Sequence, residues 1–153
     1  MHITGAICLD NMNVIHQENE RINSDSVVRF LKKLETANAK YNKIYLICDN
    51  AGYHKGKKVK EFLEKSKIKL IFLPAYSANL NPIERLWKVM HENVTYNKYY
   101  LKFTDFTEAI RNFFGSIPKL YDQLADRITD NFPMVKFNPI CMATTIITEE
   151  RQL

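Results

Sequence analysis

Two stretches decide the fold: Ile44-Tyr45-Leu46-Ile47-Cys48-Asp49-Asn50, and Leu73-Pro74-Ala75-Tyr76-Ser77-Ala78-Asn79-Leu80-Asn81-Pro82-Ile83-Glu84-Arg85-Leu86-Trp87. The first is an unbroken apolar run ending in an acid, which is typical of a strand covered on both faces of a sheet. The second leaves a strand at Pro74 and starts a helix at Asn81-Pro82, with a capping Asn followed by Pro at the first helical position. The sequence therefore predicts an α/β fold with Asp49 at a strand tip and Glu84 on the first turn of a helix.

The flanking sequence predicts a mixed β-sheet flanked by helices. Short apolar runs at 3–9 and 14–17, separated by a turn-rich Asn and Asp cluster, predict a β-hairpin. Between and after the two decisive stretches, the apolar periodicity predicts helices beginning at Ser24 and after Asp49, a strand at 68–73, and helices at 103–114 and 118–131. The order of strand, helix and strand around Asp49 favours a parallel pair joined by a crossover.

Composition is that of one ordinary globular domain. The chain has 153 residues, a net charge of +5 and three cysteines that are too far apart for a zinc pattern. The positive charge makes a polyanion a plausible partner, although a merely solvated basic surface is the alternative. The absence of a signal peptide or a membrane-length apolar run favours the cytoplasm and no membrane partner.

The last residues of the chain follow neither helical nor strand periodicity. We therefore predict a domain at 1–137 and a tail at 138–153 of uncertain structure, either disordered or appended.

Asp49 and Glu84 are candidate metal ligands, with 34 residues between them. Carboxylates held rigidly at a strand tip and a helix start can bind Mg²⁺ or Mn²⁺, and two such ions can promote phosphoryl transfer. Each acid also has an ordinary explanation, because Asp49 can make a turn with the residues after it and Glu84 can form a capping box with Asn81.

The motif Asp49-Asn50-Ala51 with His54 and Lys55, followed by the stretch from Leu73 to Trp87, resembles the catalytic domain of bacterial insertion-sequence transposases of the mariner-like superfamily. These are DDE enzymes with an RNase H-like fold, and the resemblance covers roughly Thr4 to Phe137. It implies Mg²⁺-dependent (or Mn²⁺-dependent) DNA cleavage and strand transfer, with DNA at transposon ends and targets as the partner and two ions in the complete site.

Carried over residue by residue, the resemblance makes Asp49 the second catalytic acid and Glu84 the third. It assigns supporting roles in the motif to Asn50, His54, Asn79 and Asn81, and DNA contacts to Lys55, Lys57, Lys58, Tyr76, Arg85 and Lys88. For His54, capping of the following helix is an equal alternative. Trp87 is expected to be a core residue rather than a base-stacking platform.

The family's first acid lies on a strand that would precede Met1, so the first strand of the RNase H-like sheet is expected to be missing. Asp10 is the one acid in the hairpin, but it occupies the turn. A missing strand would leave backbone groups unpaired, which predicts a homo-oligomer, strand exchange, or a second polypeptide that supplies the first acid.

Three functional readings follow. The first is a transposase catalytic domain. The second is a catalytically inactive remnant that binds DNA through its lysines and inhibits intact transposase by pairing with it. The third, another RNase H-like nuclease such as a resolvase, is disfavoured by the specific sequence before Glu84.

Overall fold

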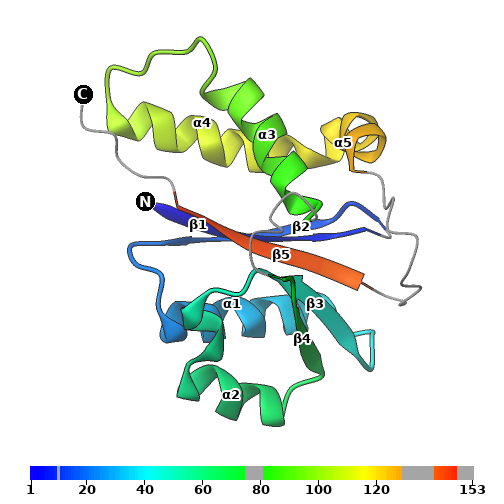
Figure 1. Cartoon of the computed structure of the whole chain (residues 1–153). Helices are drawn as coiled ribbons and strands as arrows, with labels where there is room; N and C mark the ends of the chain where they lie inside the picture. The colour runs from blue at the N-terminus through cyan, green and yellow to red at the C-terminus, as the bar shows by residue number, and fades with distance from the viewer. Residues whose placement is uncertain (10, 75–80, 129–139, 148–153) are drawn as a thin grey trace.

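The fold has three layers, with a five-stranded sheet between two groups of helices (Figure 1). The computed structural model describes residues 1–9, 11–74, 81–128 and the backbone of 140–147. In chain order the elements are β1 (His2–Cys8), β2 (Val14–Asn19), α1 (Ser24–Ala37), β3 (Ile44–Cys48), the 3-10 turn η1 (Gly52–Lys55), α2 (Lys57–Glu64), β4 (Ile68–Phe72), α3 (Ile83–Val94), α4 (Phe103–Ser116), η3 (Ile117–Leu120), α5 (Tyr121–Arg127) and β5 (Ile140–Ile147). In Figure 1, α1 and α2 lie on one side of the sheet and α3, α4 and α5 on the other.

The sheet has the strand order β2-β1-β5-β3-β4 and is mixed, as predicted. β1 and β2 form the expected antiparallel hairpin, and β3 and β4 form the expected parallel pair with α2 in the crossover. The parallel ladder continues past β4, where the Leu73 N–H donates to the Cys48 carbonyl over 2.9 Å. The carboxyl ends of β3 and β4 therefore meet at one place in the sheet.

The structure corrects the prediction for the end of the chain. Residues 140–147 form β5, which pairs antiparallel with β1 and parallel with β3 in the middle of the sheet. Its residues are mostly β-branched or apolar, as suits a strand with neighbours on both edges. The sequence pattern did not reveal this strand, because a central strand is covered on both faces and its residues do not alternate between apolar and polar. β5 also pairs the edge of β1 that was expected to be open, so the unpaired-edge argument for oligomerisation loses its basis.

The helix boundaries shift slightly from those expected. α1 is capped by Asn23 rather than Ser24: the Ser26 N–H donates to Asn23 Oδ1 over 2.9 Å, and the Asn23 N–H donates to Ser26 Oγ over 3.0 Å. The helix expected at 118–131 is divided into η3 and α5, with Pro118 in the first turn of η3; residues 129–131 lie outside the described part.

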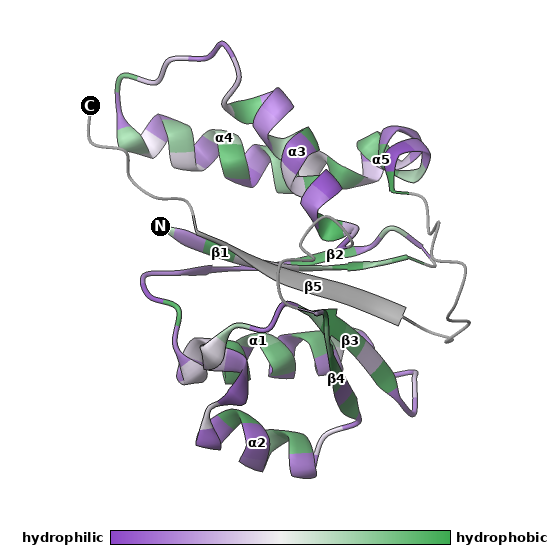
Figure 2. Cartoon of the chain, in the orientation of Figure 1, coloured by the Kyte–Doolittle hydropathy of each residue, from purple (hydrophilic) through white to green (hydrophobic). Residues whose placement is uncertain are grey.

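Two apolar clusters, one on each side of the sheet, hold the layers together. The cluster on the α3 side contains Ile3 and Ile7 of β1 together with large side chains such as Trp87 and Phe114. The cluster on the α1 side contains Ala6 of β1 with smaller groups from α1, α2, β3 and β4. Figure 2 shows β3 as largely hydrophobic, and the helices as alternating between hydrophobic and hydrophilic residues, as amphipathic helices do.

Trp87 and Gly5 determine how closely α3 approaches the sheet. Trp87 is 2% exposed, which confirms it as a core residue. A Cβ at Gly5 would lie 2.7 Å from Trp87 Cη2, so only glycine allows this contact without rearrangement. None of the helices among the described residues is both long and apolar enough to cross a membrane.

Candidate active site

Asp49 is the first residue after β3, at the carboxyl end of the parallel pair. Its Oδ1 accepts the Ala51 N–H over 3.3 Å, so the turn expected after this strand is present. The side chain is 40% exposed. Asp49 is thus held by local backbone and remains open to a ligand.

His54 lies behind Asp49 in η1 and is almost fully buried. Its Nε2 is 3.4 Å from Asp49 Oδ1, which is longer than a strong hydrogen bond. The His54 contact, followed by the Ala51 N–H, lowers the pKa of Asp49, while burial opposes this. The capping alternative for His54 is wrong, because Gly56 precedes α2 with no side-chain cap.

Glu84 is on the first turn of α3, as predicted, and is half-buried. The Glu84 N–H donates to the Asn81 carbonyl over 3.0 Å, and Asn81 Oδ1 accepts the Ile83 N–H over 3.4 Å. Burial raises the pKa of Glu84, and the charge of Asp49 raises it further. Asp49 therefore lies near enough to Glu84 for its charge to disfavour the ionised form of Glu84.

The α3 core holds Glu84 in this position. The neighbouring residues Ile83, Leu86 and Trp87 are all at most 2% exposed. Asn81, a predicted supporting residue, is itself buried, but the prediction that it caps the helix with Pro82 at the first helical position is wrong: Pro82 is the cap residue of α3, and it has no side-chain cap hydrogen bond. Glu84 can therefore move little toward or away from Asp49 without disturbing the core.

The predicted DNA contacts separate into two groups. Lys55, Arg85 and Lys88 are exposed on the elements that carry the acids. Lys57 and Lys58 are exposed on α2, but each faces an acid: Lys57 Nζ lies 3.8 Å from Glu61, and Lys58 Nζ lies 2.7 Å from Asp25. Asn50 is exposed beside Asp49. Tyr76, Asn79 and the hairpin acid Asp10 lie outside the described residues.

The cysteines contribute no ligand that the structure shows. Cys8 and Cys48 are buried free thiols, and burial followed by the charge of Asp49 raises the pKa of Cys48 to about 12. Among the described side chains, no group of three His, Cys, Asp or Glu is placed to hold a metal ion. The oxygen donors of Asp49 and Glu84 suit Mg²⁺ or Mn²⁺, so these two residues fit part of a divalent-metal site.

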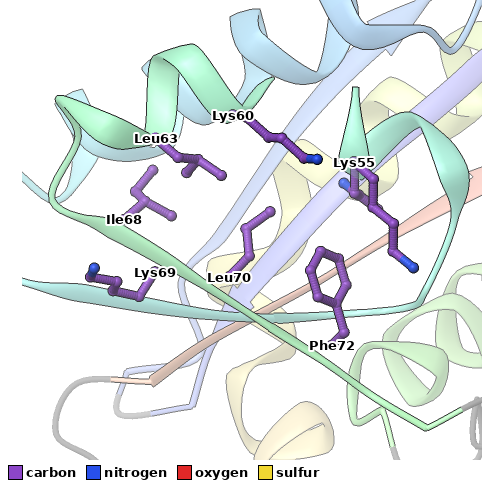
Figure 3. A pocket seen from close by; sticks show the side chains of 8 residues that line it. Lys55, Lys60, Leu63, Ile68, Lys69, Leu70 and Phe72 are labelled. Carbon is purple, nitrogen blue, oxygen red and sulfur yellow. The ribbon is translucent and has the colours of Figure 1, made fainter. Parts of the chain in front are cut away.

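Sequence reasoning missed a pocket of about 250 Å³ between α2 and the edge strand β4 (Figure 3). Its lining includes Lys60 and Lys69, which were not among the predicted contacts, and Phe72, which is 39% exposed. The sequence contained one sign of this pocket, which is Phe72 at the end of a predicted strand with lysines nearby. Apolar periodicity could not show that the lysines share a pocket.

Comparison with known proteins agrees with the sequence motifs. The chain is 31% identical over 99 residues to the insertion element IS630 uncharacterized 39 kDa protein of Shigella sonnei, covering 62% of this chain and 29% of that protein. It is 36% identical over 78 residues to the uncharacterized protein y4pE/y4sA of Sinorhizobium fredii, covering 51% and 53%. It is 35% identical over 71 residues to the Tc3 transposase of Caenorhabditis elegans, covering 46% and 22%.

The chain thus spans between about a fifth and about half of the length of these relatives. Their names support the expected likeness to a transposase domain of an insertion sequence. The family model of the DDE superfamily endonucleases matches residues 1–107, well over half of the chain. This match shows that the protein belongs to the DDE endonuclease superfamily.

Proposed function

We propose that this chain is the catalytic domain of a DNA transposase, with an RNase H-like fold, and that Asp49 and Glu84 bind the divalent metal ions for DNA strand cleavage and strand transfer. The observation that carries the proposal is the placement of the two acids in a chain that matches the DDE endonuclease family: Asp49 directly follows β3, and Glu84 lies on the first turn of α3. Like charges held together by a rigid fold are stabilised when a cation lies between them.

The metal ions would supply activation of the attacking water or 3′-hydroxyl and charge neutralisation at the leaving oxygen. The chain's own residues hold the ligands. His54 and the Ala51 N–H lower the pKa of Asp49 and so favour the ionised form that binds metal. Buried neighbours in α3 hold the turn that carries Glu84. Arg85 and Lys88 are exposed on the same helix and would contact DNA phosphates.

The third ligand of the complete site has a definable position in the sheet. Thr144 of β5 pairs with Gly5 of β1, and β5 pairs with β3 through Ile47 and Met142. Continuing the parallel register by two residues brings position 144 level with Asp49. β5 contains no acid. We propose that a second polypeptide supplies the missing carboxylate on an acid-bearing strand that replaces β5 between β1 and β3.

Metal binding and nicking test the role of the two acids. Mn²⁺ should raise the free energy of unfolding, by about 2.7 kcal/mol at a concentration 100 times its dissociation constant. Asp49→Asn should abolish this stabilisation and any Mn²⁺-dependent nicking of plasmid DNA. Asp105→Asn, on the first turn of α4, is a matched control. If Asp49→Asn keeps both properties, the metal site is elsewhere.

Thr144→Asp tests the position of the third ligand. The substitution puts a carboxylate at the register position beside Gly5, so Mn²⁺ affinity should rise in the variant. Thr145→Asp, one residue along the strand, belongs to the opposite side of the pleat and serves as a control. Equal gains from both variants, or no gain from Thr144→Asp, would contradict this placement.

A further inference from the structure

We propose that the pocket between α2 and β4 binds an unpaired nucleotide of the DNA strand that enters the active site. This inference rests on the proposed DNA-processing function and adds a subsite to it. The pocket is lined by His54, Lys55, Lys60, Leu63, Ile68, Lys69, Leu70 and Phe72 (Figure 3). Its volume of about 250 Å³ is below the roughly 300–1,000 Å³ of typical small-molecule sites, which suits one flat group rather than a whole cofactor.

The charge of the lining favours an anion. Three lysines and no acid line the pocket. Among the described residues no carboxylate pairs with Lys55 of η1, Lys60 of α2 or Lys69 of β4. Lys57 and Lys58, which share α2 with Lys60, each have an acidic partner. In Figure 3, Lys55 lies beside Phe72 at one end, while Lys69 lies at the other end next to Ile68. Cations at both ends match the phosphates that flank a nucleotide.

The apolar part of the lining favours a base. Phe72 is 39% exposed at the end of an edge strand, although a large aromatic side chain is normally buried. Lys55 Nζ lies 5.5 Å from the centre of the Phe72 ring. Aromatic rings next to cations are the recurrent surface on which proteins bind single-stranded nucleic acid, because bases stack on the ring and phosphates contact the cations.

The pocket is continuous with the candidate active site. His54 lines the pocket and lies 3.4 Å from Asp49. Phe72 pairs with Cys48 in the sheet, directly before Asp49. A strand with one base in the pocket would therefore extend toward the two acids.

Fluorescence anisotropy with a labelled single-stranded oligothymidylate in EDTA tests the pocket without involving metal. Phe72→Leu keeps an apolar side chain but removes the ring, and it should weaken single-strand binding about tenfold. Binding to a duplex should be unchanged. Lys60→Gln with Lys69→Gln should lower the slope of log affinity against log salt by about 1.4. The matched control is Lys102→Gln with Lys119→Gln, two exposed lysines at the start of α4 and in η3, which should change neither the affinity nor the slope by comparable amounts.

Equal losses in the control variant, or no loss in the pocket variants, would refute the pocket, and so would failure of the wild-type protein to bind the oligonucleotide. Tighter binding of a labelled poly-glutamate peptide would assign the pocket to an acidic peptide instead. The Asp49→Asn nicking assay stays informative in each case. Nicking that depends on Asp49 but is unaffected by Phe72→Leu would overturn the pocket and leave the proposed function standing.

Discussion

The two helical layers differ in what they present at the carboxyl end of β3. The α3 layer packs large side chains such as Trp87 and Phe114 against β1 and holds one half-buried carboxylate, Glu84. The α1–α2 layer packs smaller side chains and carries exposed lysines on its surface. The difference indicates a division of roles, in which a rigid layer positions the metal ligand and a cationic layer receives the substrate. Truncation of buried side chains in the α3 layer should therefore cost stability, whereas changes to the exposed lysines of the α1–α2 layer should not.

The largest effect is expected from Trp87→Ala, which removes the centre of the α3 core. Loss of a fully buried tryptophan should lower the free energy of unfolding by about 3–5 kcal/mol, measured by urea denaturation. Lys88→Ala, at the exposed neighbouring position, should change it by less than about 0.5 kcal/mol. Similar values for the two variants would mean that α3 is not anchored through Trp87.

A smaller loss is expected from Gly5→Ala, because the added Cβ would lie 2.7 Å from the Trp87 ring. Overpacking of this kind should cost about 1–3 kcal/mol. Gly115→Ala is a contrasting control: nothing lies within 4 Å of its Cβ, and the exposed position in α4 should become more stable by about 0.5–1 kcal/mol. If Gly5→Ala leaves the free energy of unfolding unchanged, α3 can shift away from the sheet to make room for the added Cβ.

The two acids should respond to pH with opposite signs. The pKa of Asp49 is lowered in the folded state, so its stabilisation is present above the unfolded pKa and is lost as pH falls through the folded pKa. The pKa of Glu84 is raised by burial and by Asp49, so the folded state keeps its proton longer and stability falls as pH rises between the unfolded and folded values.

Glu84→Gln removes the loss of stability that comes from deprotonating Glu84 in the folded state. The variant should gain stability relative to wild type, by less than about 1 kcal/mol, as pH rises through this window in metal-free buffer. Urea unfolding measured from pH 3 to pH 7 checks the trend. If the difference in the free energy of unfolding between the variant and the wild type is the same at every pH in that range, the pKa of Glu84 is not raised in the folded state.

The smallest effect is expected on the cationic layer. Lys58→Ala breaks the ion pair with Asp25, but both side chains are more than 60% exposed. Pairs of this kind contribute about 0.2–1 kcal/mol, and less in high salt. The change in the free energy of unfolding should therefore be close to the error of a urea titration. A loss as large as that of Gly5→Ala would remove the contrast between the layers.

Local sequence patterns predicted most of the framework around the site. The apolar run before Asp49 indicated a two-sided strand, and Asn81-Pro82 indicated the helix start that places Glu84 on its first turn. Both predictions rest on short-range chemistry, namely proline geometry, capping and periodicity. The same reasoning failed for residues 140–147, because their place in the sheet depends on pairing with β1 and β3, which are far away in the sequence.

The sequence by itself determined which residues are chemically able to act: two acids of the right type at element ends, a basic surface, and the motif shared with the DDE endonucleases. Tertiary structure alone decided that Glu84 is half-buried, that His54 lies next to Asp49, and that Lys60, Lys69 and Phe72 share a pocket. The physical reason is that burial, charge coupling and pocket shape depend on distances between residues from different elements. Only the packing of the layers sets those distances.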